Sequence, residues 1–437
     1  MSHELIALCF FALALILLTL GVHIGLVLAL AGCLGIVAVT GSFTSALGVL
    51  KTTPYHAVAI YDLSVVPLFI LMGMFSLYGG ISEGIYKAIN AWVGRFRGGL
   101  GIATTWACTA FGATSGSSIA ASSVFTKVSL PEMRKAGYEP HFACANIATA
   151  ATIAMLIPPS LYLVIYGMLA EASIARLLMA GVFPGILMAA TLSVGIFLMA
   201  VRNPRLAPVA PTLISWKERM VSTGKAWPMA VLALIIIGGI YSGVFTPTEA
   251  ASVGAFTALI ISVAQRKLNW NQLTTSLIET AFTAALLMFV IIGATIFSRL
   301  LTISGLTIWL GEVVAGSGLS SLTLIIVLMI LFIILGCFID ALSIMFITMP
   351  VFIPIVEAFG INLIWFGVLT TVALNLGVIT PPFGLCVYTV KAIAGPDVTV
   401  EGVFRAAIPM YFPILATLVI LIAFPIISVL LPKTMMG

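Results

Sequence analysis

The chain has 437 residues, of which 62% are hydrophobic and only 8% are charged. Soluble globular domains carry about 25% charged residues, so this composition excludes them and predicts an all-α polytopic membrane protein. Long apolar runs without alternation exclude a β-barrel. The net charge of +5 does not indicate nucleic-acid binding, because the basic residues are scattered through short connections.

Apolar stretches long enough to cross a bilayer recur along the chain. We expect ten spans, at about residues 5–21, 23–40, 60–80, 142–168, 177–200, 228–244, 249–264, 278–300, 361–390 and 407–431. The six cysteines all lie in apolar segments without paired spacing, and we interpret them as small core residues.

Two further segments, at about 100–127 and 322–353, have the pattern of re-entrant hairpins. Each has two apolar halves joined by a short polar tip, 111–119 in the first and 335–343 in the second. Irregular backbone at membrane depth is stable only where it is buried in protein or lines a cavity. A double proline follows each tip inside an apolar segment, 46 positions from Gly112 to Pro158 and 45 from Gly336 to Pro381. The near-equal spacing predicts a duplicated unit with two interrupted helices.

The distribution of Lys and Arg predicts the orientation. One set of connections holds fifteen of the 19 basic residues, and the other holds only Lys51, Arg176, Arg299 and Lys433. The first set is therefore predicted to be cytoplasmic, with both termini periplasmic. The two hairpins then open from opposite faces, so that the two units form an inverted repeat, which is typical of secondary transporters.

We expect five segments in the chain. Residues 1–60 are N-terminal scaffold helices, and 61–170 are the first repeat unit. Residues 171–276 are further scaffold helices, and they include a cytoplasmic linker at 202–225 with one amphipathic helix near Trp216. The second repeat unit covers 277–394, and 395–437 forms a C-terminal helix.

The first tip has the composition of a cation site. Hydroxyl oxygens come from three residues, and two glycines let the backbone turn and expose carbonyls. The double proline cannot donate backbone hydrogen bonds, so carbonyls near Ala154 and Ile157 are left free. Close helix packing by small residues is the alternative interpretation. The tip residues are Gly112, Ser115, Gly116, Ser117 and Ser118.

Asp340 is the one acid well inside an apolar segment of the second half. An intramembrane carboxylate is a functional-site hypothesis by default, and the alternative is a helix-capping or structurally salt-bridged aspartate. Its expected partners are Thr380 and the Gly377 carbonyl. Asn146 and Asn375 precede the double prolines and would either bind substrate or bridge helices. Thr246 or Thr248 is expected to cap a span, with Glu249 in its first turn.

The sequence does not contain the residues that other functional classes require. No phosphate-binding loop for an ATP-driven pump occurs. A serine protease would need a base beside Ser115, and only His23 lies well inside a span. An aspartyl protease would need a second acid at mid-depth to face Asp340, and Asp62 lies at a span end. A passive channel would not need two opposed hairpins. The sequence therefore favours a secondary transporter over any enzyme.

Over nearly its whole length the chain resembles the large membrane subunit of tripartite ATP-independent periplasmic (TRAP) transporters. The motifs that carry the resemblance are Ser115–Ser118 with Pro131-Glu-Met133 and Gly137-Tyr138, Ile157-Pro-Pro-Ser160, Thr246-Pro-Thr-Glu-Ala250, Asp340 with Pro350 and Pro354, and Phe366-Gly367 leading to Gly377-Val-Ile-Thr-Pro-Pro-Phe-Gly384. Ala154 departs from the pattern, since similar proteins often carry glycine there.

The resemblance implies an elevator-type, Na⁺-coupled importer of organic acids in a bacterial inner membrane. C4-dicarboxylates, sialic acid and other sugar or keto acids all fit, and an H⁺-coupled organic-anion transporter without a binding protein is the alternative. It also implies a small four-helix membrane subunit and a soluble periplasmic binding protein, which would dock near 246–248 or 311–320.

The resemblance further implies the ligands of two Na⁺ sites and of the substrate. The first Na⁺ site would use Ser115, Ser117, Ala154, Ile157 and Pro159. The second would use Gly336, Asp340, Gly377 and Thr380. Ser118 and Ser160 would face the substrate between the two tips.

Overall fold

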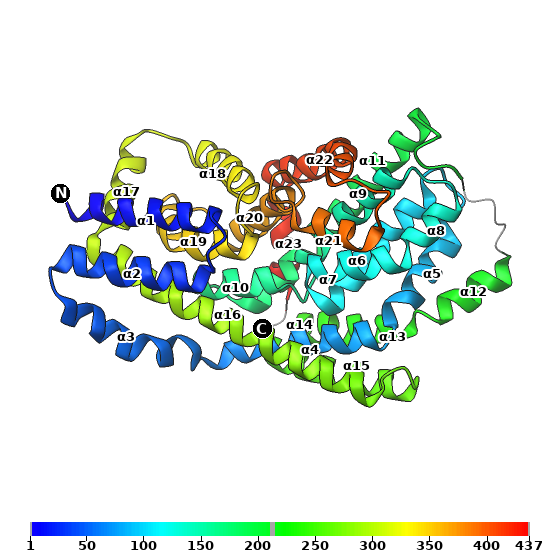
Figure 1. Cartoon of the computed structure of the whole chain (residues 1–437), viewed down its shortest axis with the longest axis horizontal. Coiled ribbons are helices and arrows are strands. Elements are labelled where there is room, and N and C mark those ends of the chain that lie inside the picture. The colour runs from blue at the N-terminus through cyan, green and yellow to red at the C-terminus, as the bar shows by residue number, and fades with distance from the viewer. Residues whose placement is uncertain (1, 210–214, 436–437) are drawn as a thin grey trace.

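The computed structural model describes residues 2–209 and 215–435, and this part of the chain contains helices and no strands. The N-terminal helices are α1 (His3–Thr19), α2 (Ile24–Thr40) and α3 (Phe43–Val58). The sequence analysis predicted a connection where α3 forms. Helix α3 lies with α1 and α2 at one end of the molecule, opposite α12 (Trp216–Gly224) (Figure 1).

The first repeat unit contains the elements expected of it. A 3-10 turn, η1 (Tyr61–Ser64), leads into α4 (Val65–Tyr78), and the amphipathic α5 (Ile81–Val93) follows. The hairpin is formed by α6 (Gly99–Ser115) and α7 (Ser118–Val128), followed by α8 (Leu130–Lys135). The interrupted helix begins with α9 (Pro140–Ala151) and η2 (Thr152–Met155) and resumes as α10 (Leu161–Leu169).

The second repeat unit has the same order. Helix α16 (Trp270–Ser304) leads to the short α17 (Leu306–Gly316). The hairpin is formed by α18 (Ser321–Gly336) and α19 (Ala341–Ala358). The interrupted helix consists of α20 (Leu363–Gly377) and α21 (Leu385–Ala394). Both predicted hairpins and both interrupted helices are therefore confirmed.

The remaining helices connect or flank the two units. Between them lie α11 (Ile174–Arg202), α12, α13 (Trp227–Ala233), the π-helical turn η3 (Leu234–Gly238), α14 (Gly239–Tyr241) and α15 (Pro247–Ala264). The chain ends with α22 (Val400–Ala423) and α23 (Ile426–Thr434). The predicted span 407–431 is wrong in its bounds. Helix α22 begins at Val400, and the helical structure is interrupted at Phe424 and Pro425.

Helix α12 confirms the amphipathic helix expected near Trp216, although residues 210–214 of the predicted linker lie outside the described residues. It begins with a capping box, in which Ser215 Oγ accepts from the Glu218 amide and the Glu218 carboxylate accepts from the Ser215 amide at 2.8 Å. The hydrogen bond from the Ser215 backbone lowers the pKa of Glu218.

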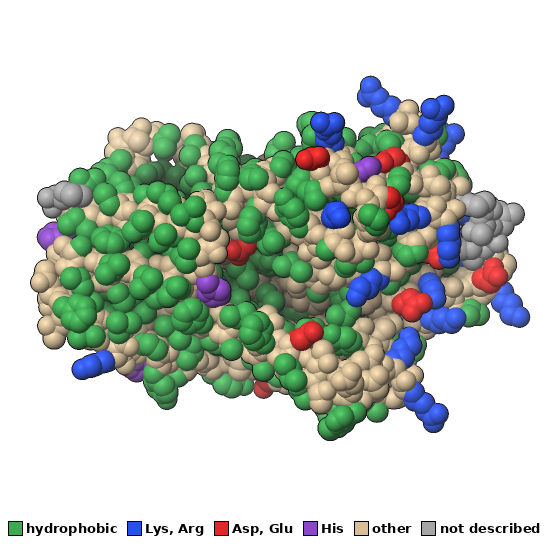
Figure 2. Space-filling model, in the orientation of Figure 1, with side chains coloured by type: hydrophobic (Ala, Val, Ile, Leu, Met, Phe, Trp, Pro, Cys, Tyr) green, Lys and Arg blue, Asp and Glu red, His purple; other side chains and the backbone are tan. Residues whose placement is uncertain are grey.

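Within the described residues, six helices are long and apolar enough to cross a membrane, or seven if the bent pair 216–224 and 227–241 is one span. One of the six is α19, a hairpin half, and several predicted spans, among them those at α1 and α2, are shorter apolar helices. The number of crossings and the division into five segments stay predictions. Most visible Lys and Arg side chains gather at one end, over α5, α8 and α12 (Figure 2).

The two repeat units pack on each other. Helix α21 contacts α7 and α9, so the second interrupted helix lies against the first hairpin. At the charged end Arg134 forms an ion pair with Asp397 at 2.9 Å and donates to the Ala394 carbonyl at 2.8 Å. His141 Nε2 accepts from the Thr399 amide at 3.3 Å in the same region. These contacts join the end of α21 to α8 and α9.

Candidate functional site

The first hairpin turns at Gly116, which has a left-handed backbone with φ of 56° and ends α6. Ser117 then begins α7, and its side chain accepts from the Ala120 amide at 3.3 Å. A Cβ atom on Gly116 would collide with the Pro159 carbonyl oxygen, and one on Gly112 would lie 2.9 Å from Ala154 Cα. The tip therefore packs directly against the break between α9 and α10.

This contact brings three residues predicted for the first Na⁺ site, Ala154, Ile157 and Pro159, to the hairpin tip, while Ser115 lies against Gly73 of α4. Ser115 Oγ is buried and has no hydrogen-bond partner within the described part of the chain. An unpartnered oxygen at that position fits a cation ligand, because a buried hydroxyl without a partner is costly. The Pro159 carbonyl lies against the same tip, and Ala154 and Ile157 lie against Gly112. The hydroxyl of Ser117 is used in the cap of α7.

The second tip repeats this packing. A Cβ atom on Gly336 would lie 2.7 Å from Gly377 Cα, so the end of α18 meets the end of α20. The Phe383 amide donates to the Cys337 carbonyl at 3.0 Å, which joins the tip to the second break. In both units a hairpin tip contacts the middle of an interrupted helix, which is the arrangement expected of re-entrant hairpins.

Asp340 is the N-cap of α19. Its carboxylate accepts from the Ser343 amide at 3.0 Å and from Ser343 Oγ, and no basic side chain pairs with it among the described residues. The capping interpretation is therefore confirmed, while the ion-ligand role stays a prediction. Both carboxylate oxygens keep further acceptor capacity. Thr380 donates to the Leu376 carbonyl at 2.7 Å, and the Gly377 carbonyl accepts from the Thr380 amide at 3.0 Å.

Tyr162, which no motif in the sequence indicated, lies on α10. Helix α10 packs on α19, the helix that Asp340 caps. The only sequence signal for Tyr162 was its position two residues after Ser160.

The other predicted substrate residues lie elsewhere. Ser160 is fully buried and caps α10, where its hydroxyl accepts from the Leu163 amide at 3.1 Å and donates to the Met155 carbonyl. Asn146 is fully buried against Gly101, about fifteen helical residues, or roughly 20 Å, from the first tip. Asn375 is also fully buried, and its amide contacts the Met188 sulfur of α11 at 3.6 Å. Both side-chain atoms of Asn146 and the Asn375 oxygen have no hydrogen-bond partner within the described residues, so the choice between substrate binding and helix bridging stays open.

A cavity of about 310 Å³ lies between α3, α10, α16 and α19. Its polar lining residues are Arg299, Thr52, Thr53, His56 and Thr295, and Phe346 lines it from α19. Arg299 forms no ion pair within the described part of the chain. In the sequence, Arg299 indicated only the orientation of the chain. No motif marked its side chain as a possible ligand of an anion.

Thr246 caps α15 as predicted, since its Oγ1 accepts from the Glu249 amide at 3.3 Å and Glu249 accepts from the Thr246 amide at 2.9 Å. Thr246 and Thr248 also line a cavity of about 680 Å³ with Asp62 and Glu171. The second predicted docking region is partly helical, because α17 extends to Gly316.

The core interpretation of the cysteines holds for three of the six. Cys108, Cys144 and Cys386 are buried, whereas Cys9 is exposed on α1. The core interpretation is wrong for Cys9, because α1 is apolar on its exposed face as well as on its buried face. No group of three or more His, Cys, Asp or Glu side chains that could hold a metal ion occurs in residues 2–209 and 215–435.

Residues 11–427 match the sequence profile of the family described as the tripartite ATP-independent periplasmic transporter, DctM component. The chain belongs to this family. The C4-dicarboxylate TRAP transporter large permease protein DctM of Pseudomonas aeruginosa is 35% identical, with 85% of this chain and 86% of that protein covered. The ectoine/5-hydroxyectoine TRAP transporter large permease protein UehC of Ruegeria pomeroyi is also 35% identical over the same shares.

The sialic acid TRAP transporter permease protein SiaT of Haemophilus influenzae is 33% identical, with 85% of this chain but only 60% of the permease covered. Among solved structures, the YdaH transporter of Alcanivorax borkumensis has a similar fold, with a TM-score of 0.57 and 17% identity over 86% of this chain and 88% of YdaH. As a member of the TRAP large permease family, the protein is a multi-pass membrane transporter subunit and not an enzyme.

Proposed function

We propose that this chain is the transport subunit of a Na⁺-coupled importer of organic acids in a bacterial inner membrane. One observation carries the proposal: each hairpin tip packs against the break of an interrupted helix, at Gly116 with Pro159 and at Gly336 with Gly377. Such breaks supply backbone carbonyls and helix ends that coordinate Na⁺ in secondary transporters. The unpartnered Ser115 hydroxyl supports an ion at the first of these contacts.

An anionic substrate is supported by Arg299. Its cavity opens between α3 and α16 on one side and α10 and α19 on the other. A guanidinium matches a carboxylate or sulfonate in geometry and charge. We propose substrates of the organic-acid class, which includes the C4-dicarboxylates and sialic acid named for relatives, bound between Arg299 and the residues around Tyr162.

An elevator movement is the proposed mechanism. The two repeat units are joined by packing of α21 on α7 and by the hydrogen bond from Arg134 to the Ala394 carbonyl, so they would move as one body. The Arg299 cavity would then lie at the boundary between this body and the scaffold. Movement of the body along this boundary would carry the substrate from one side of the membrane to the other.

Two partners complete the proposal: a small four-helix membrane subunit and a soluble periplasmic binding protein. The binding protein would deliver substrate by docking near Thr246–Thr248, where Asp62 and Glu171 line a cavity. The sialic acid permease is longer than this chain and has room for a fused small subunit.

Uptake by proteoliposomes that contain the chain, its small subunit and the binding protein tests the proposal. Concentrative uptake should require external Na⁺ and should stop when the binding protein is omitted. Uptake that continues in Na⁺-free buffer but collapses when a pH gradient is dissipated would support the H⁺-coupled alternative instead.

Ser115→Ala should raise the Na⁺ concentration for half-maximal uptake about tenfold, which corresponds to ~1.4 kcal/mol for the loss of one oxygen ligand. Ser193→Ala is a matched control, because that hydroxyl donates only to the Ala189 carbonyl of its own helix at 2.7 Å. Equal Na⁺ requirements in both variants would remove Ser115 from the ion site.

A further inference from the structure

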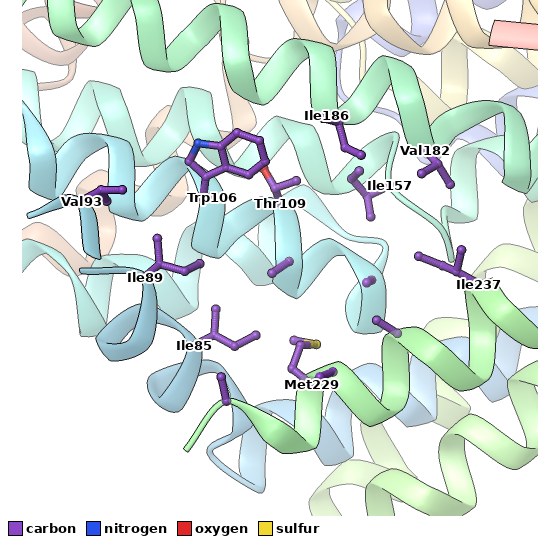
Figure 3. A pocket seen from close by; sticks show the side chains of 15 residues that line it. Ile85, Ile89, Val93, Trp106, Thr109, Ile157, Val182, Ile186, Met229 and Ile237 are labelled. Carbon is purple, nitrogen blue, oxygen red and sulfur yellow. The ribbon is translucent and has the colours of Figure 1, made fainter. Parts of the chain in front are cut away.

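An open crevice of about 620 Å³ lies between α5, α6, α11 and α13. The side chains of Ile85, Ile89, Trp106, Ile186 and Met229 point into it (Figure 3). Its polar side-chain groups are the Thr109 hydroxyl, which donates to the Thr105 carbonyl at 2.8 Å within α6, and the indole N–H of Trp106. The other lining side chains are apolar, so the walls offer an occupant mainly contact with hydrocarbon.

One end of the crevice adjoins a group of tryptophans. Val93 and Ala226 line the crevice, and their chain neighbours Trp92 and Trp227 are 40% and 52% exposed. Trp216, which stacks edge-on against Trp92 at 5.6 Å between ring centroids, is 67% exposed. Exposed tryptophans of membrane proteins gather at the headgroup level. This end of the crevice therefore lies near the lipid headgroups.

Arg219 supplies a positive charge at the same place. Its guanidinium carbon lies 5.8 Å from the centroid of Trp92 and 5.5 Å from that of Trp216. No acidic partner is found for it in the part of the chain that the structure describes, and its buried Nε has no hydrogen-bond partner there. The nearby acid Glu218 is occupied by the cap of α12. An anionic group is the complement to this arrangement.

We propose that the crevice binds one acyl chain of an anionic phospholipid whose phosphate is held by Arg219 on the Trp92–Trp216 platform. The volume lies within the ~300–1,000 Å³ typical of small-molecule sites. A helix of ~10 Å diameter would fill it within roughly five residues, so a partner helix is a poor fit. A flexible hydrocarbon chain joined to a negative headgroup matches both the crevice and its charged end.

Native mass spectrometry of the full-length chain, delipidated in detergent and titrated with phosphatidylglycerol, tests this site. The wild-type protein should retain one phosphatidylglycerol, and phosphatidylcholine with the same acyl chains should bind about fivefold more weakly, the factor expected for one basic contact with an anionic lipid. Arg219→Gln should remove this preference. Ala230→Phe should abolish retention of both lipids, because Ala230 lines the crevice and is exposed to it.

Two matched controls distinguish this site from the general lipid surface. Arg205→Gln removes an exposed charge near the same end, and Ala190→Phe fills a separate apolar groove between α11 and α22. Both should bind phosphatidylglycerol as the wild type does, and thermal melting should show that all variants are folded. Equal retention by Ala230→Phe, no headgroup preference, or loss of the lipid on addition of the small membrane subunit would each overturn the proposal.

Discussion

The carboxylate of Asp340 caps α19 through Ser343 and is also the proposed charge of the second ion site. The two roles separate in two substitutions. Asparagine is as good an N-cap as aspartate, whereas alanine costs ~1 kcal/mol at such a position. Asp340→Asn therefore removes the charge and keeps the cap, and Asp340→Ala removes both.

We expect Asp340→Asn to raise the Na⁺ concentration for half-maximal uptake several-fold with little change in melting temperature. Asp340→Ala should lower both Na⁺ affinity and stability. Because coupling between two ligands is reciprocal, substrate should also bind more weakly to the asparagine variant. If Asp340→Asn keeps the wild-type Na⁺ requirement while Asp340→Ala melts early, the residue acts only as a cap.

Gly116 is fixed by its backbone conformation and by its neighbour. A left-handed backbone costs about 1–2 kcal/mol for a residue with a side chain, and a Cβ atom would also collide with the Pro159 carbonyl. Gly116→Ala should therefore destabilise the protein by at least that amount in thermal unfolding. Gly311→Ala is the control, since nothing lies within 4 Å of its Cβ position. Similar melting temperatures for the two variants would contradict the close packing of the first tip.

Helix α15 shows how a local motif fixes one element. Its capping box joins Thr246 and Glu249 by hydrogen bonds of 2.9 and 3.3 Å. Thr246→Ala should destabilise the protein by about 1 kcal/mol, and Thr246→Ser should restore most of the loss because serine caps equally well. Thermal unfolding in detergent measures both. A loss of uptake in Thr246→Ser without a loss of stability would point to a docking role for the threonine methyl group instead.

The charge distribution of the whole molecule predicts its orientation. Fifteen of 19 basic residues lie in one set of connections, and the charged side chains gather at one end (Figure 2). We expect both termini to be periplasmic. A reporter active only in the cytoplasm should be silent when fused after Gly437 and active when fused after Arg205 in the predicted linker. The reverse pattern would invert the orientation and the proposed openings of both hairpins.

Features that depend on neighbours along the chain could be predicted from the residues alone. Glycines and serines at the tips, double prolines in the breaks and the Thr246 cap act within a few residues, so both hairpins and both interrupted helices were predicted. Helix α3 was missed because Lys51 and Pro54 weaken its apolar pattern. The interrupted end of the last predicted span, at Pro425, was missed because the apolar composition continues across it.

Which distant residues meet depends on the tertiary fold. Helix α10 with Tyr162 packs on α19, which Asp340 caps, and no motif joins the two. Asn146 and Asn375, for which the sequence left substrate binding and helix bridging open, are both fully buried. Arg299 and the crevice beside Trp106 depend on the packing of four helices each. In an apolar chain most helix faces have the same composition, so the sequence does not distinguish a face that packs from one that lines a cavity.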